Sequence, residues 1–193
     1  DIYFNQGHLA ESLMLFNHID EITRQLKNTA AQNNGGVKIE DADKFRGDVV
    51  DQLVQNAVLN PSAEIKGLSR FILKSAALEL GIVNSSIQGL YEARGRGEVK
   101  GFTVPALNIR GMPYELCRAI FRTAIKTNAG AFIFELAKSE MSYTFQKPHE
   151  LSTVILAAAI KEGFTGRVFI QGDHFQVNAK NYAQDPEKEV AGL

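Results

Sequence analysis

Three short apolar segments in the second half of the chain constrain its fold more than any other feature. They lie at residues 102–109, 131–136 and 167–171, and a helical pattern follows each of the first two. Near-continuous apolar segments of this length are typical of strands that are buried on both faces of a sheet. Strands joined by helices pair in parallel through right-handed crossovers. The sequence therefore predicts an α/β fold with a parallel sheet.

Proline and glycine mark the ends of the connecting helices. Pro113 introduces the first helix, and Pro148 opens the second, which ends at Gly163. Proline is favoured at the start of a helix and glycine just after its end. Three strand–helix steps of this kind open either a doubly wound sheet or a (β/α)₈ barrel. A barrel takes roughly 200–250 residues, so this chain would hold less than half of one.

The glycine pattern argues against a dinucleotide site. A Rossmann sheet has Gly-x-Gly-x-x-Gly directly after a strand. The Gly-x-Gly of this chain, at Gly95 and Gly97, follows a helical pattern and precedes the first predicted strand. We therefore expect no dinucleotide cofactor.

The first half of the chain shows helical patterns only. Apolar residues recur at helical spacing in 9–27, 40–59 and 61–81. A shorter helix is expected to follow, with its N-terminal cap at Asn84 or Ser85. The sequence thus predicts a first half without strands.

Three parts are expected along the chain. Residues 1–8 resemble a disturbed protease-site linker from an expression vector, and we exclude them from the fold. Residues 9–97 form a helical region, in which 28–36 is predicted to be a loop. Residues 98–193 carry the strands, either of a doubly wound sheet or of a partial (β/α)₈ barrel.

Charge and cysteine content exclude several classes of protein. Lys and Arg number 21 and Asp and Glu 22, so the net charge is −1 and a nucleic-acid-binding footprint is not supported. No apolar run reaches the roughly 18–20 residues of a membrane span, and no signal-peptide pattern is evident. The single cysteine, Cys117, excludes an internal disulfide and is predicted to fill the core. These features favour a cytoplasmic protein.

Polar residues follow all three predicted strands, where parallel α/β folds gather their chemistry. The pair Asp173-His174 is the most informative, because a neutral imidazole can bind a metal and a carboxylate can transfer protons. An aspartate that only caps a turn is the alternative interpretation. The full set of strand-end residues is Asn108, Arg110, Glu135, Lys138, Ser139, Glu140, Gln171, Asp173 and His174.

Three stretches resemble the class II, metal-dependent fructose- and tagatose-bisphosphate aldolases. They are GFTVPALNI at 101–109, AGAFIF at 129–134 and VFIQGDH at 168–174. The first strand of that family ends in a similar Asn-containing segment, and its third strand ends in an Asp-His segment. The resemblance covers about 98–176 and has no counterpart in the helical region.

The resemblance implies a fold, a reaction and three residue roles. The fold is a (β/α)₈ barrel, and the reaction is cleavage of a ketose bisphosphate into two triose-type fragments. Asp173 would transfer the proton, His174 would be a Zn²⁺ ligand, and Asn108 would hold the phosphorylated sugar. The zinc ion polarises the substrate carbonyl and stabilises the enediolate in such enzymes. The chain departs from the family at Gly172 and Phe175.

Other functions remain open at this point. Gly-Asp-His also occurs in an accessory subunit of tagatose-bisphosphate aldolase that is regarded as non-catalytic, so a non-catalytic aldolase-like subunit is one alternative. A second is an interaction module, in which the helices of 9–91 bind a partner. An open sheet edge would also favour a homo-oligomer.

This chain alone is expected to have no aldolase activity and no tight metal site. Catalytic zinc takes three protein ligands, and the chain offers His174 as a good candidate and His149 as a poor one. Glu135 and Glu140 could complete the set only if the loop 138–147 folded inward. Glu135 is otherwise expected either to have a functional role in the barrel interior or to pair with Arg110 or Lys138.

Overall fold

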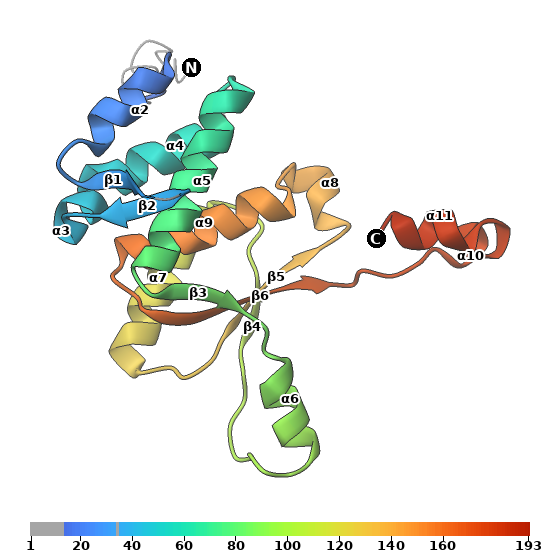
Figure 1. Cartoon of the computed structure of the whole chain (residues 1–193). Helices are drawn as coiled ribbons and strands as arrows, with labels where there is room; N and C mark the ends of the chain where they lie inside the picture. The colour runs from blue at the N-terminus through green and yellow to red at the C-terminus, as the bar shows by residue number, and fades with distance from the viewer. Residues whose placement is uncertain (1–13, 34) are drawn as a thin grey trace, which may run out of the picture.

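The computed structural model describes residues 14–33 and 35–193, which form a four-stranded sheet, a separate hairpin and several helices (Figure 1). The strands are β1 (Ala30–Asn33), β2 (Gly36–Ile39), β3 (Ile82–Ser85), β4 (Ala106–Asn108), β5 (Ile133–Ala137) and β6 (Gly166–Asp173). The helices are α2 (Ile19–Leu26), α3 (Ala42–Lys44), the π-helical η1 (Phe45–Val49), α4 (Val50–Leu59), α5 (Ala63–Glu79), α6 (Gln88–Gly95), α7 (Pro113–Thr127), α8 (Glu140–Thr144), α9 (Pro148–Lys161), α10 (Ala179–Gln184) and α11 (Pro186–Ala191).

The four-stranded sheet is parallel throughout and has the order β3-β6-β5-β4. The α/β fold with a parallel sheet is therefore confirmed. All three predicted strands form, although the first is shorter than expected. It begins at Ala106, after Pro105, which has no N–H to donate to a ladder. The carbonyl of Pro105 still accepts a hydrogen bond from the Ile133 N–H at 2.8 Å.

The prediction that residues before 98 hold helices only is wrong. The hairpin β1–β2 occupies most of the expected loop, and β3 occupies the expected helix cap at Asn84 and Ser85. Gly81, with a φ of 76°, ends the preceding helix, and Ile82 then pairs with Gly166 at the start of β6. Strand pairing has therefore overridden the local helical pattern.

The N-terminal part of the chain limits two further predictions. Residues 1–8, and 9–13 of the first expected helix, lie outside the described residues. Within the described part this helix begins only at Ile19, where α2 starts.

Helix α9 lies at the centre of one continuous core, in contact with α4, α5 and α7. Its residues from Val154 to Ile160 are all buried, and three consecutive alanines, at 157–159, let neighbouring helices approach closely. Phe121 on α7 adds an aromatic cluster, with ring centroids of Phe132, Phe134 and Phe164 at 4.9 to 5.7 Å. The expected helical region and the strands thus share one core.

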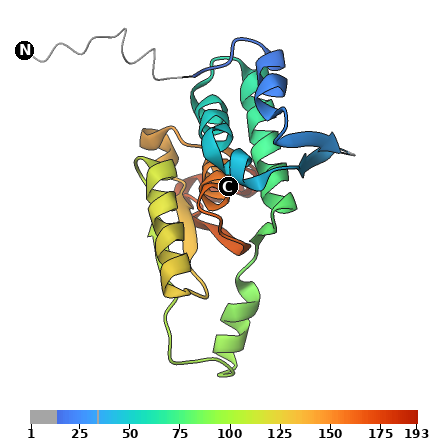
Figure 2. The ribbon, with the colours of Figure 1, turned by 90° about the vertical axis from the view of Figure 1, so that its left-hand side faces the viewer.

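Two helical segments extend away from this core. Helix α6 projects beyond the sheet in two perpendicular views (Figure 1 and Figure 2). Helices α10 and α11 pack against each other to one side of the sheet (Figure 1). No helix within residues 14–33 and 35–193 is both long and apolar enough to span a membrane.

Substitutions at two glycines test the effects of helix propensity and of backbone strain separately. Gly67 is exposed in the middle of α5, and a Cβ there would meet no atom within 4 Å. We expect Gly67→Ala to raise the free energy of unfolding by about 0.5–1 kcal/mol, because alanine favours the helix. Gly166 has equal space but a φ of 113°. Alanine is strained at this φ, so Gly166→Ala should lower the free energy of unfolding by about 1–3 kcal/mol. Urea unfolding measures both, and a change of the same sign in the two variants would contradict this explanation.

Candidate active site

A cluster of polar side chains lies where β4, β5 and β6 end. Asn108 is the last residue of β4, Asp173 is the last of β6, and Glu140 begins α8 just after β5. The amide of Asn108 donates to Glu140 Oε2 and to Asp173 Oδ2, each at 3.3 Å. One amide therefore joins two carboxylates that come from distant parts of the chain.

His174 extends this cluster. Its Nδ1 lies 2.6 Å from Oδ1 of Asp173, and its backbone has a left-handed φ of 51°. Neighbouring residues of an extended strand point to opposite faces, and this turn instead brings the two side chains together. The bond to His174 and the amide of Asn108 lower the pKa of Asp173, so its carboxylate is ionised near neutral pH. The structure thus brings all three predicted site residues into one chain of contacts.

The sequence made Glu140 a site candidate only if the loop 138–147 folded inward. Its side chain is only 4% exposed, and it accepts hydrogen bonds from Arg110 Nε, Asn108 Nδ2 and the Ala137 N–H. Burial alone would raise the pKa of Glu140, but these hydrogen bonds outweigh burial and lower it. The segment after β5 does fold inward at this residue. The available signal was a carboxylate three residues beyond a buried strand.

The expected pairing of Glu135 with Arg110 or Lys138 is wrong. Glu135 lies opposite Gln171 in the β5–β6 register and accepts a hydrogen bond from its amide. Arg110 pairs instead with Glu140, and Lys138 donates to the Gly192 carbonyl at 2.8 Å. Strand register, which spacing alone does not define, decides these partners.

The two departures from the aldolase pattern prove to be one packing arrangement. A Cβ on Gly172 would lie 2.7 Å from Cδ2 of Phe175, closer than side chains tolerate. The small residue in the strand therefore makes room for the aromatic ring that follows the turn. Both line a cavity of about 330 Å³ together with His149.

The described residues do not form the predicted zinc site by themselves. Within the part of the chain that the structure describes, no three His, Cys, Asp or Glu side chains are grouped so that they could hold a metal ion. His174 offers one imidazole next to Asp173, while His149 lines the neighbouring cavity. A catalytic zinc takes three protein ligands, so the donor set falls short.

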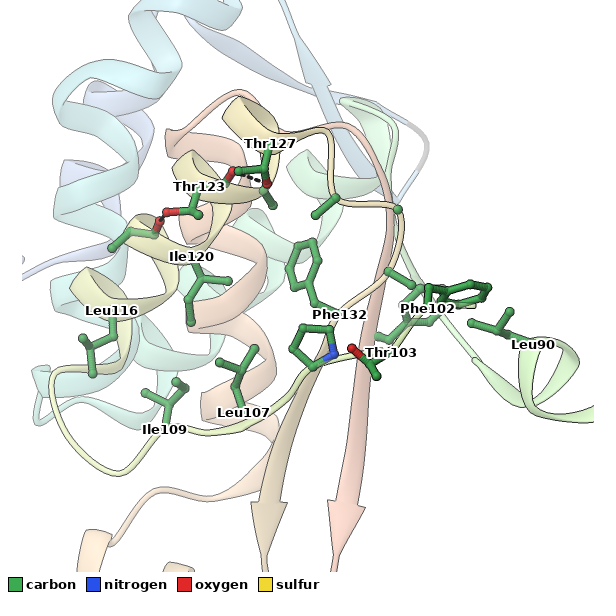
Figure 3. A pocket seen from close by; sticks show the side chains of 17 residues that line it. Leu90, Phe102, Thr103, Leu107, Ile109, Leu116, Ile120, Thr123, Thr127 and Phe132 are labelled. Atoms are coloured by element: carbon green, nitrogen blue, oxygen red, sulfur yellow. Dashed lines mark hydrogen bonds between the residues drawn. The ribbon is translucent and has the colours of Figure 1, made fainter. Parts of the chain in front are cut away.

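A larger cavity, of about 1070 Å³, lies along β4 and α7 (Figure 3). Its lining includes Leu107, Leu116, Ile120 and Phe132, and it contains no ionisable side chain. The hydroxyl of Thr123, which also lines it, donates to a carbonyl of its own helix. An apolar cavity of this kind has no group to transfer a proton, so the polar cluster is the candidate active site.

Comparison of the chain with protein-family models, with curated proteins and with solved structures finds no match. The resemblance to class II aldolases rests on its three segments. Two of those segments contain Asn108 and the pair Asp173-His174.

The lowered pKa of Glu140 predicts a pH-dependent contribution to stability. The contribution is fully present above the ordinary value of 4.5 and is lost as the pH falls through the lowered pKa of the folded state. We expect Glu140→Gln to lower the free energy of unfolding at pH 7 by about 1 kcal/mol, because its NH₂ group would face the Arg110 donor. The difference from wild type should shrink below pH 4.5. Urea unfolding between pH 3 and 7 measures it, and a difference that does not change with pH would contradict the assignment.

Proposed function

We propose that this cluster is the active site of a lyase of the class II aldolase type, which cleaves a carbon–carbon bond in a phosphorylated ketose. The observation that carries the proposal is the Asp173 carboxylate, fixed between the Asn108 amide and the His174 imidazole. It stands at the carboxyl end of a parallel sheet, where α/β enzymes place their catalytic groups. The resemblance to the aldolases supports the same residues.

Asp173 is suited to proton transfer. Its side chain is 26% exposed, so a substrate can reach it, and its lowered pKa keeps it ionised. In the cleavage direction it would accept the proton of the hydroxyl on the carbon whose bond breaks, as that carbon becomes a carbonyl. The electron pair of the broken bond stays with the other fragment, which becomes an enediolate. Asn108 has its amide at the same place and can hold a substrate hydroxyl.

Zinc remains a prediction. A zinc ion would supply Lewis-acid polarisation of the substrate carbonyl. His174 is its one expected ligand among the described residues, with Nδ1 directed to Asp173 and a side chain that is 76% exposed. The proposed step at Asp173 rests on the geometry of this carboxylate alone.

The proposal extends to the architecture and to the cell compartment. As the first three strands of a (β/α)₈ barrel, β4, β5 and β6 would continue beyond β6, where β3 now pairs. Closure into a barrel would therefore require β3 to leave that edge.

The outer edge of β4 supports the expected self-association. The free thiol of Cys117 is buried, which raises its pKa to about 12 and fits a cytoplasmic protein.

The two alternatives differ in their support. A non-catalytic aldolase-like subunit would have the same cluster and no turnover, so activity distinguishes it. The interaction module has less support, because α4 and α5 pack against α9 and contribute to the shared core.

Substitution of Asp173 tests the proposal. In a protein that carries the complete barrel, we expect Asp173→Asn to lower the turnover of fructose 1,6-bisphosphate by about 10²–10⁴-fold, because the amide keeps the shape and cannot accept the proton. Asp43→Asn is the matched control, since the side chain of Asp43 is 97% exposed. Triose release in a coupled assay measures both. Equal turnover in the wild type and Asp173→Asn would refute the assigned role, and a wild type without turnover would favour the non-catalytic subunit.

Metal content tests the role of His174. We expect His174→Ala to retain less zinc than the wild type after dialysis, because a coordinate bond is lost. His18→Ala is the control, because His18 is exposed at the start of α2. Elemental analysis gives the zinc per chain. Equal zinc in the two proteins, in a wild type that retains zinc, would show that His174 is not a ligand, and a wild type that retains none would refute the zinc site.

A further inference from the structure

Arg110 is anchored at one end of the polar cluster and open at the other. Its Nε donates to the buried carboxylate of Glu140, yet the Arg110 side chain is 57% exposed. The hydrogen bond to Glu140 uses Nε, and the phenol of Tyr143 lies beside the guanidinium. The guanidinium therefore presents its terminal donors to the space beside the site.

The hydrogen bond to Glu140 fixes the orientation of the Arg110 guanidinium before a ligand binds. The Glu140 carboxylate also accepts hydrogen bonds from the Ala137 N–H and from Asn108, and these bonds restrict its rotation. Glu140 and, to a lesser degree, the phenol of Tyr143 raise the pKa of Arg110, so it stays charged. A fixed guanidinium loses little side-chain entropy when it binds an oxyanion through two parallel hydrogen bonds.

Arg110 and Asp173 lie at two positions of one continuous array of contacts. The array runs from Arg110 through Glu140 and Asn108 to Asp173 and His174. The Asn108 amide donates to both carboxylates, so one side chain connects Glu140, which holds Arg110, with Asp173. A ligand with its reacting carbon at Asp173 can therefore extend along Asn108 towards the guanidinium.

The charges of the array restrict which ligand can fit. Glu140 and Asp173 contribute two carboxylates to the array, so we expect an anionic group to be held only where the Arg110 guanidinium faces it. A hydroxylated body donates hydrogen bonds to the carboxylate and the amide, while one terminal oxyanion meets the guanidinium. A phosphorylated polyol has this combination of groups.

We propose that Arg110, held in place by Glu140, binds the terminal phosphate of a phosphorylated sugar whose reacting carbon lies at Asp173. This assignment rests on the proposed lyase site and adds to it the group that recognises the phosphate. The Nη1 and Nη2 donors form the two-pronged contact, which lysine cannot reproduce.

Ligand affinity tests this assignment without any turnover. Isothermal titration calorimetry with dihydroxyacetone phosphate and with unphosphorylated dihydroxyacetone gives the contribution of the phosphate. We expect the phosphate to tighten binding to the wild type by about 10-fold or more, and we expect Arg110→Gln to abolish that difference. Arg96→Gln is the matched control, because Arg96 forms an exposed ion pair with Glu98 outside the cluster. An equal Kd for dihydroxyacetone phosphate in the wild type and Arg110→Gln would overturn the proposal.

A second variant guards against misfolding. Arg110→Gln leaves the buried Glu140 without its charged partner, so thermal melting is measured for each variant. If Arg110→Gln does not fold, Arg110→Lys carries the test, because it keeps the charge and loses the two-pronged contact. Arg110→Lys should bind the phosphate several-fold more weakly than wild type, and an unchanged Kd would overturn the assignment.

The outcomes also separate this proposal from the lyase. Cleavage that depends on Asp173, together with an affinity that does not depend on Arg110, would leave the lyase standing and refute the phosphate contact. An affinity that depends on Arg110, in a protein that does not cleave the sugar, would support the phosphate contact and refute the lyase.

Discussion

The parallel pairing of β4, β5 and β6 is the interaction on which the candidate site depends. Its register places Asn108 opposite Glu135, and Ala137 opposite Asp173. The bond between Asn108 and Asp173 therefore joins side chains that are 65 residues apart in the chain. A shift of one residue in the pairing of β4 or β6 would turn Asn108 or Asp173 to the other face of the sheet.

The core holds this register in place. Helix α9 is buried along most of its length, and it contacts helices from both halves of the chain. Strands of three to five residues, such as β4 and β5, have too few ladder bonds to define their own alignment. Phe121 and the rings around it instead fix α7 against the sheet. Packing on one side of the sheet thus positions the polar residues at its end.

Glu140 connects this scaffold to the chemistry. A buried carboxylate is costly unless hydrogen bonds satisfy it, and here a backbone N–H, an amide and a guanidinium do so. The same bonds fix the orientation of Asn108 and Arg110. One buried residue that needs no contact with substrate can therefore order the groups on either side of it. Asp173 and His174 complete the array through a left-handed turn at the strand end.

Local sequence patterns determined the elements that carry the site. Near-continuous apolar segments predicted the three parallel strands, and Pro113 and Pro148 predicted the starts of α7 and α9. Asn108, Asp173 and His174 belong to the polar residues predicted at the ends of those strands, and the resemblance to the aldolases selected them as site residues. The strands and helix starts depend on a residue and its immediate neighbours, so spacing is enough to find them.

Only the tertiary structure decided the partners. The four residues of β3 are too short for a recognisable period, and their pairing with β6 makes them a strand. The same holds for the salt bridge between Arg110 and Glu140, for the hydrogen bond between Glu135 and Gln171, and for the ring of Phe175 over Gly172. These contacts join segments whose distance in space depends on register and turn geometry. A hydrogen-bond partner is chosen by position in space, which the order of residues along the chain does not specify.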